Sequence, residues 1–285
     1  MRYYIDTEFL EGPQKEKFPI SLFRKETPNT IDLISIGIVA EDGREYYAIS
    51  KDFNLKEAWN RFDLVQQSGD MRNVFPEGKK EYWIRENVLK PIWRELFFKY
   101  DDCLGLSNKQ IDSYSKSILS GQHDKHFSFE SLKILINKYG KTNKEIAEEI
   151  KKFTSVVQDF NDKTTGHYLK TNVDYSMPEF YAYYADYDWV VFCWLFGRMI
   201  DLPNGFPMYC KDLKQVLDKK EADLKSENGI TIKGPYVESV GAFESFHFKS
   251  IKDIPNYPKQ DQSKSHNAIE DARWNKQLYE FLNSF

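Results

Sequence analysis

"RYYIDTEF", at residues 2–9, decides how the chain begins to fold, because its side chains alternate in character along the segment. Such alternation is typical of a β-strand with one face turned to a core. Two segments rich in β-branched and aromatic residues follow, "TIDLISIGIVAE" at 30–41 and "REYYAIS" at 44–50, and the Asp42-Gly43 pair between them is a strong hairpin signal. The first fifty residues therefore predict an antiparallel meander.

The rest of the chain combines helical periodicity with short apolar strands. Pro91 predicts a kink in the first helix, and we interpret the polar region at about 94–141 as a helical insertion or flap. Helices are predicted at 79–100, 142–157, 187–200, 211–220 and the carboxyl end, strands at 179–186 and 207–210, and a Gly-rich polar stretch at 226–265. This order predicts one domain over residues 1–285, of the α/β or α+β class, with helices on the faces of a mixed sheet.

The composition limits what the protein can be. With 40 Lys and Arg against 44 Asp and Glu, the formal net charge is −4, so any nucleic-acid binding has to be local. Three cysteines, Cys103, Cys193 and Cys210, are too few and too scattered for a disulfide framework and favour a reducing compartment. The amino terminus lacks a signal-peptide pattern, and the most hydrophobic run, at 189–197, is shorter than the ~20 residues that cross a bilayer. We expect a cytoplasmic protein without a membrane partner.

Two carboxylates lie on the predicted first strand. Because alternate side chains of a strand share a face, Asp6 and Glu8 point the same way, with Cα atoms roughly 6.5 Å apart. Two neighbouring carboxylates on an otherwise hydrophobic strand repel each other unless a cation lies between them. A solvated strand end is the alternative interpretation.

A second acidic pair lies where a predicted strand gives way to a helix, in "YYADYDWVVF". Ligand sites of open α/β folds lie at the carboxyl ends of strands, which is where Asp186 and Asp188 fall. Asp is also a favoured residue at the beginning of a helix, so helix capping is the alternative for either residue.

The third acidic segment is "HNAIEDAR" at 266–273, just before an apolar helical stripe that includes Trp274 and Leu278. Asp271 heads this inward face, where a carboxylate is costly unless it is paired or bound to a metal. If the helix begins at about Asn267, His266 lies in the preceding loop and can reach the site that Asp271 enters. Glu270 is expected to face solvent and to complement the helix dipole.

Together these segments predict a metal site. Asp6, Glu8, Asp271 and one of the two aspartates at 186 and 188 supply oxygen ligands without thiolates, which suits Mg²⁺ or Mn²⁺. Two such ions would activate a water and stabilise the leaving oxygen of a phosphodiester, and His266 would take the proton as a general base near neutral pH. Hydrolysis of phosphodiesters is the predicted chemistry.

The three segments also resemble a known family. "DTE" at 6–8, "YDWVVF" at 187–192 and "HNAIEDAR" at 266–273 look, in that order, like the three motifs of the RNase T-like DEDDh 3′-to-5′ exonucleases. Within that superfamily, "YDWV" at 187–190 and "DLKQ" at 212–215 are most similar to the mycobacterial-type 3′ exoribonuclease branch. The resemblance implies an RNase H-like mixed sheet flanked by helices, with the segment at about 94–141 as an insertion.

The resemblance also implies a role for each matching residue. Asp6, Glu8, Asp188 and Asp271 would be ligands of two Mg²⁺ or Mn²⁺ ions, with Asp186 as the alternative second-motif ligand, and His266 would be the general base.

Two neighbouring residues have a weaker assignment. By resemblance, Phe9 and Leu10 would border the terminal base of the substrate, and packing at a strand end is an equal alternative for both.

The activity that the resemblance implies is metal-dependent 3′-to-5′ exonucleolysis that releases nucleoside 5′-monophosphates. The substrate would be RNA, or single-stranded DNA, with a free 3′ end, and a homodimer could form. One alternative is a hydrolase of short oligonucleotides or dinucleotides. A second, from another class, is a catalytically silent nucleic-acid-binding module, which a missing ligand or base would have marked.

Overall fold

The computed structural model describes residues 1–16, 19–65, 79–99, 126–154, 177–226, 229–237, 242–261 and 264–284. Its centre is a mixed sheet, as predicted, and this sheet has five strands in the order β3-β2-β1-β6-β7. β1 pairs antiparallel with β2 and parallel with β6, and β2 pairs antiparallel with β3, which confirms the amino-terminal meander. The strands are β1 (Arg2–Gly12), β2 (Thr30–Ala40), β3 (Glu45–Ile49), β6 (Glu179–Ala182) and β7 (Lys211–Asp212).

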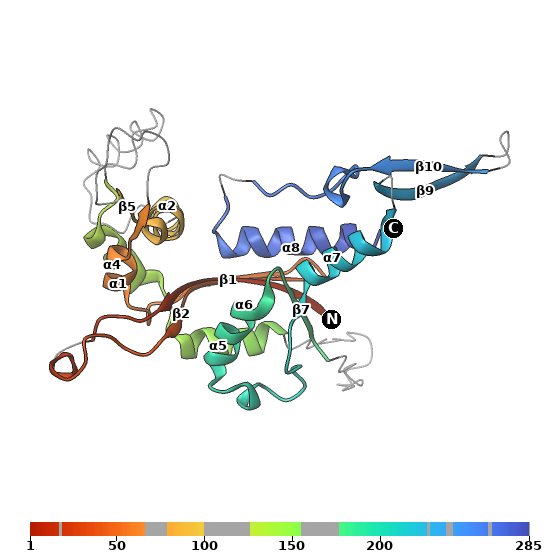
Figure 1. Ribbon diagram of the computed structural model, residues 1–285. Helices are drawn as coiled ribbons and strands as arrows, with labels where there is room; N and C mark the ends of the chain where they lie inside the picture. The colour runs from red at the N-terminus through yellow and green to blue at the C-terminus, as the bar shows by residue number, and fades with distance from the viewer. Residues whose placement is uncertain are drawn as a thin grey trace, which may run out of the picture.

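Helices cover both faces of this sheet (Figure 1). The carboxyl-terminal helix α8 (Ala268–Leu282) packs on β1 and β2 from one side, with α7 (Leu213–Leu224) beside it. On the other side lie α5 (Asn143–Thr154) and α6 (Ala185–Phe196). This arrangement is an α+β fold of the RNase H-like type, as expected.

The two faces of β1 are sorted by the strand period of two. Tyr3 and Ile5 belong to a core cluster with residues of α5 and α6, whereas Tyr4 packs in a cluster with residues of α7 and α8. Asp6 and Glu8 follow Tyr4 on the α8 side. The predicted sharing of one face by these two carboxylates is therefore confirmed.

A second group of helices packs over the part of the meander that contains Leu10, Ile34 and Ile49. These elements are α1 (Leu55–Asn60), the π-helical turn η2 (Arg85–Leu89), α2 (Lys90–Lys99) and α4 (Phe129–Tyr139). Pro91 lies at the start of α2, directly after the π-helical turn, which agrees with the predicted kink because proline cannot donate to the helical ladder. The predicted insertion at about 94–141 stays a prediction, since 100–125 lie outside the described residues.

Two predicted elements need correction. The helix expected to begin at residue 79 begins later, because Lys79–Glu81 forms strand β5, which pairs with β4 (Asp63–Val65). The strand expected at 207–210 is wrong, since the strand in this place is β7. It is only two residues long because the Asp212 side chain accepts a hydrogen bond from the Lys214 N–H and so begins α7.

The polar stretch at 226–265 contains a β-hairpin. The hairpin consists of β9 (Gly229–Val237) and β10 (Ala242–Phe248). With the short strand β8 (Lys225–Ser226), which pairs with β9, it forms a separate sheet that projects from the body of the protein (Figure 1). Polar and apolar residues alternate in "ITIKGPYV" and "AFESFHF", and this strand pattern outweighs the glycines, which favour a loop. Short 3₁₀ turns complete the described fold: η1 (Ile20–Leu22), η5 (Met199–Asp201) and η6 (Ile251–Asp253).

Within the described part of the chain, we find no helix with both the length and the apolar character needed to span a membrane.

Candidate active site

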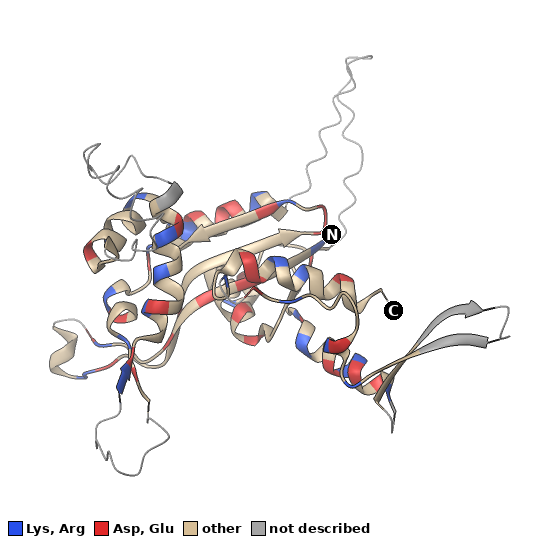
Figure 2. Cartoon of the chain, turned by 90° about the horizontal axis from the view of Figure 1, so that it is seen from above, with Lys and Arg blue, Asp and Glu red and all other residues tan. Residues whose placement is uncertain are grey.

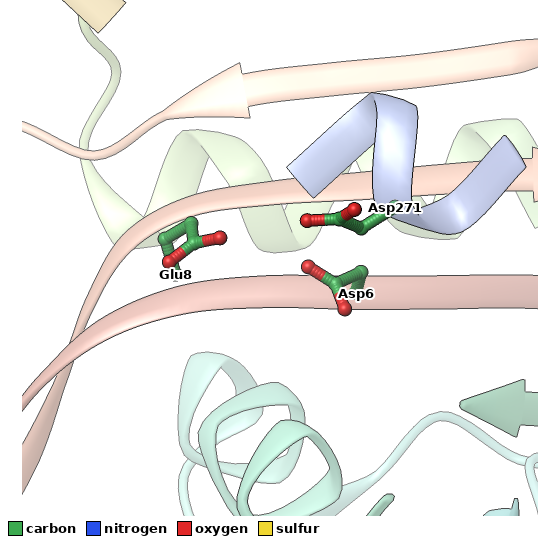
Figure 3. Close-up of side chains that lie close together, drawn as sticks. All are labelled: Asp6, Glu8 and Asp271. Atoms are coloured by element: carbon green, nitrogen blue, oxygen red, sulfur yellow. The ribbon is translucent and has the colours of Figure 1, made fainter. Parts of the chain in front are cut away.

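Three carboxylates meet between β1 and the first turn of α8. Ligand oxygens of Asp6, Glu8 and Asp271 all lie within 4.8 Å of one another. Figure 3 shows the three side chains pointing into the same space, two from the strand and one from the helix. The sequence placed these residues 265 positions apart at their extremes, from 6 to 271, and the packing of α8 on β1 brings them together.

A glycine allows α8 to approach the sheet this closely. Gly37 of β2 pairs with Asp6, and a Cβ atom at Gly37 would lie 2.2 Å from the carbonyl oxygen of Ala268. Any side chain here would therefore push the first turn of α8, and Asp271 with it, away from Asp6. Our sequence analysis missed Gly37, although a glycine inside a β-branched strand is a signal for a close backbone approach.

A buried asparagine fixes the same contact from the helix. Asn275, one turn after Asp271, is 1% exposed, and its Nδ2 donates to the carbonyl oxygen of Ile5 at 2.8 Å. This hydrogen bond ties α8 to β1 at the residue that precedes Asp6. The sequence analysis also missed Asn275, and the available signal was a polar residue within an otherwise apolar helical stripe.

Asp271 is held by neighbours that donate to it. Its side chain accepts a hydrogen bond from the backbone N–H of His266 at 2.9 Å and another from Nε2 of Gln260. Asn267 caps the helix, since its side chain accepts from the N–H of Ile269. The predicted helix start is confirmed, and Asp271 lies in the first turn as expected.

His266 lies in the loop before α8, as predicted, with a left-handed backbone at φ 64°. Its Nδ1 is 3.9 Å from Oε1 of Glu8, and its ring meets the ring of Trp83 edge-on, with centroids 4.7 Å apart. A non-glycine residue in this conformation is strained, and such strain persists where the surrounding contacts hold it. The imidazole is thus placed beside the carboxylates while staying partly exposed to the cavity.

The structure separates the two aspartates of the second motif. Asp188 is 6% exposed, and its Oδ1 accepts hydrogen bonds from the N–H of Thr7 at 2.8 Å and from Oγ1 of Thr7 at 2.6 Å. Asp186, two residues earlier in α6, is exposed and is not among the residues that line the cavity. Asp188 therefore lines the cavity from α6 but lies outside the cluster of Asp6, Glu8 and Asp271, while Asp186 faces solvent in the first helical turn.

Burial makes these carboxylates hard to ionise together. Burial first, and then the Asp188 carboxylate, raises the pKa of Asp6 well above its usual value. Burial followed by the Asp271 carboxylate does the same to the pKa of Glu8. Acidic groups that influence one another this strongly are most stable with protons or cations between them.

The pKa values of the two remaining carboxylates, Asp188 and Asp271, are raised less, because hydrogen bonds favour their ionised forms. Burial raises the pKa of Asp188 to about 7, against the effect of the two hydrogen bonds from Thr7. Burial also raises the pKa of Asp271, against the hydrogen bonds from Gln260 and His266. Among the described residues, one ion pair involves any of these four carboxylates, and it joins Glu8 to His266.

A cavity of about 860 Å³ opens beside the acidic centre. Asp6, Glu8, Asp188, His266 and Asp271 all line it. Seven aromatic residues join them in the walls: Phe9, Trp83, Tyr183, Tyr184, Tyr187, Tyr257 and Trp274. The side chains predicted to carry the chemistry thus face one space large enough for a substrate.

Of the two residues expected to border the terminal base, the structure places one at the cavity. Phe9 lines it and packs against Tyr187, with ring centroids 5.5 Å apart. Leu10 is 0% exposed in the core cluster beneath α2 and α4 and is not among the lining residues. A substrate contact for Leu10 needs correction in favour of the packing alternative, because helices cover this part of β1.

Comparison with known proteins gives a partial likeness. No family model matches the chain. Over 67 residues, 23% of this chain, the sequence is 48% identical to proteins named 3′-5′ exoribonuclease from two strains of Mycobacterium tuberculosis. The matched segment spans 31% of the length of each of these relatives.

Proposed function

We propose that this protein is a metal-dependent 3′-to-5′ exoribonuclease that hydrolyses phosphodiester bonds and releases nucleoside 5′-monophosphates. The observation that carries the proposal is the convergence of Asp6, Glu8 and Asp271 within 4.8 Å, in the wall of a large cavity and next to His266. The named activity of the mycobacterial relatives supports the choice of RNA and of the 3′ end.

The donor set fits Mg²⁺ or Mn²⁺. Asp6, Glu8, Asp188 and Asp271 offer carboxylate oxygens, which these hard cations prefer, and they are buried with no ion pair to a Lys or Arg among the described residues, so their charge is left for a cation to neutralise. When bound, two such ions would lower the pKa of a water and stabilise the leaving oxygen of the phosphodiester. The chain's own task is to hold these oxygens on rigid elements: β1 and α8, joined by the hydrogen bond from Asn275 to Ile5, and α6, joined to β1 by the hydrogen bonds from Thr7 to Asp188.

His266 would act as the general base. In its neutral form the imidazole would accept the proton of the attacking water, and the Glu8 carboxylate, 3.9 Å from Nδ1, would stabilise the imidazolium that results. The backbone N–H of the same residue holds Asp271, so one residue would couple the base to a metal ligand. The ring of Trp83, in edge-on contact with the imidazole, would restrict its movement.

The test is a time course of the purified protein on matched single-stranded RNA and DNA, labelled in turn at the 5′ and 3′ ends. With Mg²⁺ or Mn²⁺ we expect 5′-labelled RNA to shorten progressively from its 3′ end, no activity in EDTA, and none in an Asp6→Asn variant. A dinucleotide serves as a further substrate. Failure to degrade any of these substrates would contradict the proposal, and cleavage of the dinucleotide alone would replace it with a short-substrate hydrolase.

A further inference from the structure

The cavity has a wall that the proposed hydrolysis does not use. Residues 251–260, which we call the strap, connect the β9–β10 hairpin to the loop before α8 and run alongside that helix (Figure 1). Lys252, Tyr257 and Lys259 of the strap all line the cavity. The strap thus extends the cavity beyond the acidic centre with basic and aromatic side chains.

The strap is fixed to the body of the protein. Nε1 of Trp274 donates to the carbonyl oxygen of Pro258 at 3.1 Å, and Gln260 donates to Asp271. Ile251 and Ile254 are buried in the core cluster that includes α7 and α8. The two lysines are therefore carried on an anchored backbone beside the acidic centre, and their long side chains remain exposed.

These lysines differ from the third cation of the cavity. Arg61 donates to the carbonyl oxygens of Glu11 and Pro13, at 3.0 and 2.8 Å, so its guanidinium serves the fold. Within the described residues, neither Lys252 nor Lys259 takes part in an ion pair, whereas many other lysines of the protein do. In a cavity that contains several carboxylates, these uncommitted ammonium groups are suited to receive an anion.

Tyrosines at the turn from β6 to α6 line the same cavity. Tyr184 is 63% exposed and has a left-handed backbone at φ 59°, which its N–H stabilises by donating to Oδ1 of Asp212 at 3.2 Å. Tyr183 lies between Tyr184 and Trp274, with ring centroids 4.8 and 5.0 Å away, and so links this turn to the helix that anchors the strap. A strained backbone that presents an aromatic ring to solvent indicates a functional position.

We propose that the strap and the tyrosine turn form a binding channel for the nucleotides upstream of the one that is released. Lys252 and Lys259 contact backbone phosphates, and Tyr184 offers its ring to an unpaired base. Basic groups that follow the backbone, combined with aromatic rings that stack on bases, are how proteins hold single strands without reading sequence. This inference rests on the proposed function and deepens it, because it names an unpaired strand longer than a dinucleotide as the substrate.

The net charge of the protein is consistent with such a local channel. Figure 2 shows Lys and Arg interspersed with Asp and Glu along the helices, without one broad basic face in that view. A strand is therefore held by a few placed contacts, and each contact contributes to the salt dependence of binding.

The first experiment compares the wild type with Lys252→Ala/Lys259→Ala on single-stranded RNA of about ten nucleotides and on a dinucleotide, at several salt concentrations. We expect the preference for the longer strand, as a ratio of kcat/KM values, to fall about tenfold or more, chiefly through KM. The logarithmic salt dependence on the longer strand should become less steep by about 1.4, since each phosphate contact of a single strand contributes about 0.7.

Two further variants serve as controls for the lysines. Lys252→Arg/Lys259→Arg keeps both charges and should retain most of the preference. Lys152→Ala removes an exposed lysine of α5, on the opposite face of the sheet, and should match the wild type.

A second pair of variants tests the aromatic wall. Tyr184→Ala should lower kcat/KM on the longer strand by about tenfold, whereas Tyr184→Phe, which keeps the ring, should stay close to the wild type. Equal losses with both variants would show that the hydroxyl matters rather than stacking and would overturn this part of the channel.

The outcomes separate the channel from the proposed function. If the wild type degrades RNA and the lysine variant loses activity equally on both substrates, or keeps the wild-type salt dependence, the channel is wrong and the exonuclease stands. If the wild type degrades neither substrate with Mg²⁺ or Mn²⁺, the proposed function fails and the channel fails with it.

Discussion

The two faces of β1 consist of alternate residues of one strand, yet one is core and the other is a candidate site. Tyr3 and Ile5 are buried among apolar side chains on the α5 and α6 side, whereas Asp6 and Glu8 face α8 with raised pKa values. Thr7 connects the two, because it belongs to the core face but donates twice to Asp188. The period of the strand decides which residues share a face, and the elements packed on that face decide what it does.

The largest loss of activity should come from replacing Asp188, the residue to which Thr7 donates two hydrogen bonds. We expect Asp188→Asn to lower kcat about 10⁴-fold, roughly 5.5 kcal/mol of transition-state stabilisation, because the proposed metal ligand at this buried position would be lost. Asp186→Asn, two residues away and exposed, should stay within about twofold of the wild type, since surface substitutions rarely matter. The measurement is the single-turnover rate at which the 3′-terminal nucleotide is cleaved from RNA. A reversal of the two results would make Asp186 the second-motif ligand.

Replacing the proposed general base, His266 in the loop before α8, should have the next largest effect. We expect His266→Ala to slow turnover by about 10² to 10⁴-fold while Mn²⁺ binding changes little, because a general base moves a proton and leaves the ligands in place. Isothermal titration with Mn²⁺, run beside the kinetic assay, separates these roles. Loss of metal affinity in the variant would make His266 a ligand or a structural residue.

The spacing between β2 and α8 can be tested at Gly37. Gly37→Ala should lower activity by about 10²-fold even in folded protein, because a misplacement of about 1 Å is enough for such a loss. Gly140→Ala is a matched control, since its Cβ would lie 2.5 Å from the carbonyl oxygen of Ile136, away from the site.

Both glycine variants should be destabilised by about 1 to 3 kcal/mol, measured as the free energy of unfolding in urea. Only Gly37→Ala should lose specific activity once the folded fraction is equal. Equal specific activities would show that Gly37 serves stability and does not set the geometry of the carboxylates.

The smallest expected effect is that of pH on the thermal stability of the metal-free protein. The folded-state pKa of Asp188, about 7, is raised above the unfolded value, so its protonation stabilises the fold. That contribution is complete at acidic pH, below the unfolded pKa, and is lost as pH rises through about 7. We therefore expect the Tm of EDTA-treated protein to fall by a few degrees over this range, at about 2 to 4 °C for each kcal/mol.

Asp188→Asn tests the assignment of this pH dependence, because the amide does not titrate. Its Tm in EDTA should depend less on pH than that of the wild type, although Asp6 and Glu8 shift in the same direction. Saturating Mg²⁺ should flatten the wild-type profile as well, since a bound cation favours the ionised carboxylates. A steeper profile in the variant would contradict the raised pKa of Asp188.

Much of the site could be predicted from sequence because its parts are local patterns. The alternation in "RYYIDTEF" fixed the shared face of Asp6 and Glu8, and the capping residue Asn267 marked the helix start that leaves His266 in a loop. Leu10 escaped this reasoning, since the alternation of β1 continues through it while helices distant in sequence cover it. The strands of the polar stretch at 226–265 were missed because glycines hid a weak alternation.

The sequence by itself determined which residues form the meander, which side chains share a face and where the last helix begins. These properties follow from periods of two and 3.6 residues and from capping, which act over a few neighbouring positions. Only the tertiary structure decided that Asp188 and not Asp186 lines the cavity with the other carboxylates, that Gly37 and Asn275 set the spacing of β1 and α8, and that the strap lines the same cavity. Those facts depend on contacts between residues far apart along the chain, where packing rather than local propensity chooses the partner.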